Sequence, residues 1–177
     1  MFAAPLIDEA SRLVAALRAR GAKIVTAESL TGGLIAAVLT EVAGSSEVFE
    51  CGFVTYSNAA KEQELGVGGE LLARHGAVSA EVAQAMAVGA LARIKADVAV
   101  SSTGLAGPGG GSPAKPVGLV YLGAAVRGRP AIHVECRFGD IGRVSIRQAS
   151  TAAALALLWQ ALAGAGPAQG GGGLGLP

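Results

Sequence analysis

The sequence has few cysteines, few aromatic residues and almost no net charge. Its two cysteines, Cys51 and Cys136, are far apart and belong to no CxxC motif, and the two histidines are equally scattered. A structural zinc site needs about four closely spaced ligands, so neither a metal nor a disulfide framework is expected. Because 14 basic residues balance 13 acidic ones, nucleic acid is an unlikely class of partner.

Long apolar runs are also missing. Charged residues or glycines interrupt each apolar stretch well short of the roughly 20 residues that a membrane span requires, so no membrane association is expected. Residues 1–5 have no basic start and no long apolar stretch, which predicts that there is no signal peptide and that the protein is cytoplasmic.

The length and apolar content indicate one globular domain. A chain of 177 residues that is 51% hydrophobic can bury a substantial core. We expect this domain to span residues 1–163. The glycine-rich segment 164–177 cannot build a core and is expected to be a flexible tail.

Apolar periodicity predicts alternating helices and strands. The expected helices cover residues 6–17, 34–42, 58–66, 80–95 and 143–162, and the expected strands cover 23–26, 48–56, 97–101, 117–126 and 131–137. The short link 127–130 indicates a hairpin, so at least one strand pair is antiparallel. The predicted fold is a three-layer α/β/α domain with a mixed, mostly parallel sheet. Helix 80–95 is apolar nearly all round, which predicts burial or a subunit contact and hence a homo-oligomer.

Two segments carry side chains suited to nucleophilic chemistry. Ser29 lies in a small-residue turn between a strand and a helix, where a hydroxyl can attack and nearby N–H groups can hold an oxyanion. It could equally be a helix N-cap, as could Thr31. Lys61 follows Tyr56, and a buried lysine can act as the base for a serine, although a surface lysine is the simpler interpretation.

A third segment, residues 104–118, is rich in glycine and proline. It lies between two apolar strands, where long loops without regular structure are usually functional, and its free N–H groups could cradle an anion or a carbonyl. Farther along, Arg143 and Arg147 are one helical turn apart and share a face. Either one could bind a phosphate or carboxylate, or remain solvated. The histidines have no evident serine or acid partner, so a Ser-His-Asp triad is not expected.

Five ordered segments together resemble the CinA C-terminal domain family over about residues 6–163. They are Thr26–Gly33, Val54–Lys61 with Leu65–Val67, Gly76–Ser79, Thr103–Gly111 and Lys115–Gly118. Characterised members of this family are amidases that convert nicotinamide mononucleotide to nicotinic acid mononucleotide and ammonia, in pyridine nucleotide recycling. The chain lacks the molybdopterin-binding-like N-terminal domain of longer members, so a stand-alone form is expected.

The resemblance implies roles for individual residues. Ser29 would be the nucleophile, Lys61 its general base and Tyr56 an assisting group. Substrate would be bound by Arg143, with Arg147 as the alternative. The other expected substrate-binding residues are Thr31, Gly32, Gly33, Thr103, Gly104 and Gly107.

A pyridine mononucleotide is therefore the expected small-molecule partner, and no cofactor is implied. Backbone N–H groups near 31–33 or 103–107 could hold the oxyanion. Two other functions stay open at this point. One is a non-catalytic nucleotide-binding or regulatory module linked to competence or DNA damage, and the other is an amidase for a different pyridine or pterin compound.

Overall fold

The structure, a computed structural model, describes residues 2–164. The predicted tail, apart from Gly164, lies outside the described residues. The helices are α1 (Ala4–Ala19), α2 (Leu34–Thr40), α3 (Asn58–Leu65), α4 (Gly69–His75), α5 (Ala80–Arg93) and α6 (Arg143–Ala163). The strands are β1 (Ile24–Glu28), β2 (Phe49–Val54), β3 (Val98–Gly104), β4 (Leu119–Val126) and β5 (Ile132–Arg137), and a short 3-10 helix covers Ser45–Glu47.

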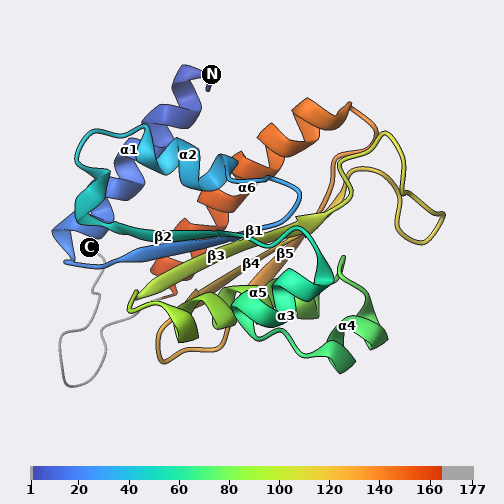
Figure 1. The fold of residues 1–177 in the computed structure, drawn as a ribbon. Helices are drawn as coiled ribbons and strands as arrows, with labels where there is room; N and C mark the ends of the chain where they lie inside the picture. The colour runs from blue at the N-terminus through green and yellow to red at the C-terminus, as the bar shows by residue number, and fades with distance from the viewer. Residues whose placement is uncertain (1, 165–177) are drawn as a thin grey trace.

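The strands form one mixed sheet in the order β2-β1-β3-β4-β5. Strand β1 is parallel to β2 and β3, whereas β4 is antiparallel to both β3 and β5. Each of the described strands except β4 therefore points the same way. Helices α1, α2 and α6 cover one face of the sheet and α3, α4 and α5 cover the other (Figure 1). The predicted three-layer α/β/α fold with its mixed sheet and 126–132 hairpin is confirmed.

Each face of the sheet packs its own apolar core. Buried residues of α1, α2 and α6, among them Leu13, Ile35 and Leu158, pack on one face. On the other face, α5 contributes Val82 and Met86, which pack with apolar residues from the strands. Because both faces are covered, the central strands β1 and β3 are almost completely buried, including the polar residues at their carboxyl ends.

Helix α5 packs closely within the chain, although Val88 on this helix is 51% exposed. A Cβ atom on Gly89 would lie 2.0 Å from the carbonyl oxygen of Leu65 at the end of α3, and a Cβ on Gly123 of β4 would lie 2.4 Å from Ala83 O. Backbone therefore packs against backbone on two sides of α5. The predicted homo-oligomer remains a prediction.

Local signals explain where several elements begin, and one element was missed. Ser79 caps α5, because its hydroxyl accepts a hydrogen bond from Val82 N, and Ser57 caps α3 by accepting from Ala60 N. Helix α4 was not predicted. It has only seven residues, and it begins at Gly69 without a side-chain cap. Within residues 2–164, no helix combines the length and apolar character that a membrane span needs.

Candidate active site

The carboxyl ends of three neighbouring strands open into a cavity of about 240 Å³. Strands β1, β2 and β3 are parallel, so the segments that follow them meet at one edge of the sheet, where open α/β sheets bind ligands. The cavity is lined by residues of segments 29–30, 56–61, 77–78 and 103–109, together with Arg143. The three segments that the sequence analysis singled out therefore come together here.

Ser29 and Lys61 are in direct contact beside this cavity. Lys61 Nζ lies 3.1 Å from Ser29 Oγ and donates a hydrogen bond of 2.8 Å to Thr55 O. The contact follows from the sheet, because Thr55 N donates to Glu28 O and extends the β1–β2 pairing by one residue. Ser29, which directly follows β1, is thereby brought beside the first turn of α3, which carries Lys61.

The amine of Lys61 is held in a poorly solvated place. The side chain is only 1% exposed, and this burial lowers the pKa of Lys61 from its ordinary value of 10.5. Among residues 2–164, no carboxylate forms an ion pair with Lys61. An uncharged amine can accept the proton of Ser29, so the pair can activate a nucleophile. Lys61 is therefore not the surface lysine of the simpler interpretation.

Glu28 shapes the turn that carries Ser29, a role that sequence reasoning missed. Its fully buried carboxylate accepts hydrogen bonds from Gly33 N and Ile35 N, each 3.0 Å, and from Ala36 N at 2.8 Å. An acidic residue satisfies the free N–H groups at the start of α2 in the way that a side-chain cap does. The signal in the sequence was an acid between a strand and a helix start.

The other residues of the turn lie behind the cavity. The Thr31 hydroxyl pairs with Ser102 Oγ at 2.6 Å, so neither Thr31 nor Ser29 caps α2, whose N-cap is Gly33. Gly32 and Gly33 have φ values of 59° and 93°, which favour glycine. The cavity lining includes Ser29 and Leu30 but not residues 31–33. Thr31, Gly32 and Gly33 therefore shape the turn behind the lining residues, and their contact with substrate remains a prediction.

Thr103 and Gly104 form the wall opposite the turn. The Thr103 hydroxyl donates to Ala77 O at 2.7 Å, so its remaining lone pairs are available to a ligand N–H group. A Cβ on Gly104 would lie 2.7 Å from Leu119 O, which requires glycine there. Lys115 ties this wall to the neighbouring loop, because its amine donates to Val78 O at 2.8 Å. Residues 77–78 belong to the Gly76–Ser79 segment of the family resemblance, but no role at the site was predicted for them.

The two arginines of α6 have different positions. Arg143 lines the cavity, where it donates to Gly107 O and to the Tyr56 hydroxyl, each at 2.9 Å. Arg147 does not line the cavity, and its guanidinium donates to Leu30 O at 3.0 Å and Thr31 O at 2.8 Å. Of the two arginines, Arg143 is therefore the one that lines the cavity. Tyr56 is 61% exposed and sits at the rim.

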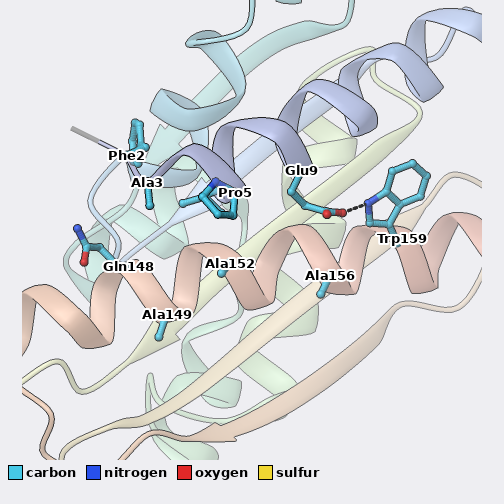
Figure 2. A pocket seen from close by; sticks show the side chains of 10 residues that line it. Phe2, Ala3, Pro5, Glu9, Gln148, Ala149, Ala152, Ala156 and Trp159 are labelled. Carbon is cyan, nitrogen blue, oxygen red and sulfur yellow. Dashed lines mark hydrogen bonds between the residues drawn. The ribbon is translucent and has the colours of Figure 1, made fainter.

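A larger cavity, of about 690 Å³, lies between α1 and α6 and has a different character (Figure 2). Alanines of α6 and the side chains of Phe2 and Pro5 line most of it, and the Trp159 indole donates to the Glu9 carboxylate (Figure 2). Glu9 is the ionisable side chain among the described residues that line it. It offers no pairing of a nucleophile with a base. Nor do residues 2–164 contain a cluster of His, Cys, Asp and Glu that could hold a metal ion.

Comparison with known proteins identifies the family. The model of the CinA C-terminal domain matches residues 7–162. The chain belongs to this family. It is 56% identical over 146 residues to the nicotinamide-nucleotide amidohydrolase PncC of Escherichia coli K12, covering 82% of this chain and 87% of that protein. It is also 53% identical over 146 residues to a CinA-like protein of Mycolicibacterium vanbaalenii, covering 82% of this chain but 34% of that longer protein.

Solved structures of the family have the same fold. The competence/damage inducible protein CihA of Agrobacterium tumefaciens superposes with a TM-score of 0.89 at 50% identity, covering 91% of this chain and 98% of that chain. A CinA superfamily protein of Klebsiella pneumoniae gives a TM-score of 0.84 at 36% identity, covering 90% and 98%. The resemblance inferred from the five segments is therefore confirmed at the level of family and fold.

Proposed function

We propose that this protein is a serine amidohydrolase that converts nicotinamide mononucleotide to nicotinic acid mononucleotide and ammonia, within pyridine nucleotide recycling. The observation that carries the proposal is the 3.1 Å contact between Ser29 Oγ and the buried Lys61 amine. The name of the 56% identical E. coli relative supports the substrate, because that protein is a nicotinamide-nucleotide amidohydrolase. Both lines of support point to hydrolysis of a carboxamide.

The dyad would work in two half-reactions. In the first, neutral Lys61 takes the proton of Ser29 as the hydroxyl oxygen attacks the carboxamide carbon, and the resulting ammonium group gives a proton to the departing nitrogen. Ammonia leaves and an acyl-serine ester remains. In the second, Lys61 takes a proton from water, the hydroxide attacks the ester, and Ser29 regains its hydrogen. The products are the acid and ammonia, and one water molecule is consumed.

The walls of the cavity supply contacts for the rest of the substrate. Arg143 presents a guanidinium at the rim beside Tyr56, which suits the substrate's phosphate. The Thr103 hydroxyl donates its hydrogen bond to Ala77 O, so its oxygen can accept an N–H of the carboxamide but cannot donate to the carboxylate of the product. This asymmetry favours the amide over the acid at the reacting end.

The test is turnover by the wild type and by Ser29→Ala, assayed as ammonia and nicotinic acid mononucleotide released from nicotinamide mononucleotide without added metal. Removing the nucleophile should lower kcat by at least about 10³-fold while the unfolding transition stays in place. Ser112→Ala is the matched control, because this exposed serine of the glycine-rich loop does not line the cavity. Turnover by Ser29→Ala within tenfold of the wild type would exclude a serine mechanism. Binding of the mononucleotide by the wild type with no ammonia released would instead indicate a regulatory module.

A further inference from the structure

The turn that carries Ser29 has its carbonyl groups held in place. Ser29 O accepts from Gly32 N at 3.0 Å, and Arg147 donates to Leu30 O and Thr31 O. Arg147 comes from α6, so a helix more than a hundred residues away in sequence fixes the backbone beside the nucleophile. Space is limited at this contact, because a Cβ on Gly32 would approach Arg147 Nη2 to 3.2 Å.

The N–H groups of this turn differ in whether they have a hydrogen-bond acceptor. The N–H of Ser29 donates to Ser102 O at 2.9 Å, that of Gly32 donates to Ser29 O, and that of Gly33 donates to Glu28. Neither glycine N–H is free for an oxyanion. Among residues 2–164, the N–H groups of Leu30 and Thr31 have no acceptor, and of these two residues Leu30 is the one that lines the cavity. Leu30 is 4% exposed and lines the cavity directly after the nucleophile.

A buried N–H without an acceptor is costly, by about 1–3 kcal/mol, unless a ligand supplies the acceptor. The orientation of the Leu30 N–H is determined by its neighbours. In a trans peptide, C=O and N–H point in opposite directions, and the cis bond of the described chain is elsewhere, at Gly107-Pro108. Because Ser29 O is turned toward Gly32 N, the N–H of Leu30 is turned away from it.

These contacts form a relay of two peptide groups. Arg147 binds Thr31 O, and the same peptide group donates its Gly32 N–H to Ser29 O. The peptide group of Ser29 O in turn carries the Leu30 N–H. Hydrogen bonds in such a chain polarise one another, so a cation at one end strengthens the donor at the other. The guanidinium therefore both orients the Leu30 N–H and makes it a better donor.

Building on the proposed function, we propose that the Leu30 N–H is an oxyanion donor for the tetrahedral intermediate and that Arg147 is the positioning residue that holds it. The alternative role of Arg147, contact with the substrate, is replaced by action through the backbone. The N–H lies on the residue next to Ser29, where it can stabilise the negative oxygen that forms when Ser29 attacks.

The direct test replaces the Leu30 N–H by an ester oxygen, by incorporating the α-hydroxy acid analogue of leucine at position 30. The side chain is unchanged, and kcat for ammonia release should fall about 10²–10³-fold, as is typical for loss of one oxyanion donor. KM for the mononucleotide should change by less than about threefold, because the donor acts in the transition state. The matched control is the same replacement at Ala114, an exposed residue of the glycine-rich loop that does not line the cavity. A kcat within threefold of the wild type for the Leu30 ester, or an equal loss for both esters, would overturn the proposal.

Arg147→Lys and Arg147→Ala test the positioning role. Both should lower kcat while leaving unchanged the pH at which kcat/KM rises, because Lys61 keeps its surroundings, and added guanidinium should restore part of the activity of Arg147→Ala. A purely structural role would lower the amount of folded protein without this rescue, and that result would contradict the proposal. The rate at which a fluorophosphonate labels Ser29 gives a reading without the mononucleotide. If the wild type is labelled but releases no ammonia, the proposed substrate is wrong, whereas equal labelling rates in wild type and Arg147→Lys would refute the positioning role alone.

Discussion

Replacing Lys61 by methionine separates catalysis from stability. Methionine has a similar length and no charge, so it fills the buried site of a side chain that is 1% exposed. Loss of the general base should lower kcat/KM by about 10²–10⁴-fold across the pH range. In the wild type, kcat/KM should rise with pH as Lys61 loses its proton, at a pH below the ordinary lysine pKa of 10.5, since burial lowers the pKa of this amine.

In contrast to its activity, the stability of Lys61→Met should not fall. Because the pKa of Lys61 is lowered in the folded state, the unfolded chain binds more protons between that lowered pKa and 10.5. The free energy of unfolding of the wild type should therefore rise with pH through this range, and the contribution of Lys61 is lost as pH falls. Lys61→Met should lack this rise and should be at least as stable as the wild type at pH 7. Urea unfolding at pH 7 and at pH 9.5 measures the difference.

For Lys61→Arg, the loss in free energy of unfolding can be worked out from the structure. The structure supplies two acceptors to the Lys61 amine, Thr55 O and Ser29 Oγ, whereas a guanidinium carries five N–H donors. About three donors would be buried without an acceptor, and at about 1–3 kcal/mol each the loss is about 3 kcal/mol or more. This loss is a large share of the free energy of unfolding of a typical domain, which is roughly 5–15 kcal/mol. A Lys61→Arg protein as stable as the wild type, or an active Lys61→Met protein, would refute the reasoning.

Two further substitutions test the surroundings of the dyad. Tyr56→Phe removes the hydroxyl that accepts a hydrogen bond from Arg143, so KM for the mononucleotide should rise several-fold. The free energy of unfolding should change little, because the ring lies at the rim of the cavity. In steady-state kinetics, a fall in kcat alone would instead mean that Tyr56 relays a proton. Glu28→Gln should lower the free energy of unfolding by about 1–3 kcal/mol, because one of the three backbone N–H groups then faces the amide NH₂ group instead of an acceptor. Denaturant unfolding measures this loss, with Glu62→Gln as the surface control. An unchanged Glu28→Gln stability would mean that the turn does not depend on the carboxylate.

The sequence was most informative where periodicity and motifs are local. Most strands and helices were predicted to within a few residues, because the strands begin with apolar, mostly β-branched residues and the capping serines mark helix starts. The seven-residue α4 gave no such pattern. The meeting of Ser29 and Lys61 came from the family resemblance, because no local signal states which strands are neighbours. Sheet order supplies the reason afterwards, since β1 lies between β2 and β3.

The assignment of the two arginines shows what local pattern cannot decide. Arg143 and Arg147 share one face of α6, so spacing treats them alike. The structure separates them because the first turn of α6 meets the rim of the cavity, where Arg143 reaches Tyr56. One turn later the same face meets the backbone of the Ser29 turn, where Arg147 finds two carbonyl groups. Their distinction depends on how α6 crosses the sheet, which is tertiary information.

The position of Glu28 explains how a buried lysine remains a base. A carboxylate paired with Lys61 would favour the charged amine and raise its pKa. Glu28 is a fully buried carboxylate only one residue from Ser29, yet it directs its oxygens to the N–H groups of Gly33, Ile35 and Ala36. Lys61 meets only a carbonyl and a hydroxyl oxygen. The turn therefore uses its negative charge to hold its own backbone, and the burial of Lys61 is left to lower the pKa of the amine.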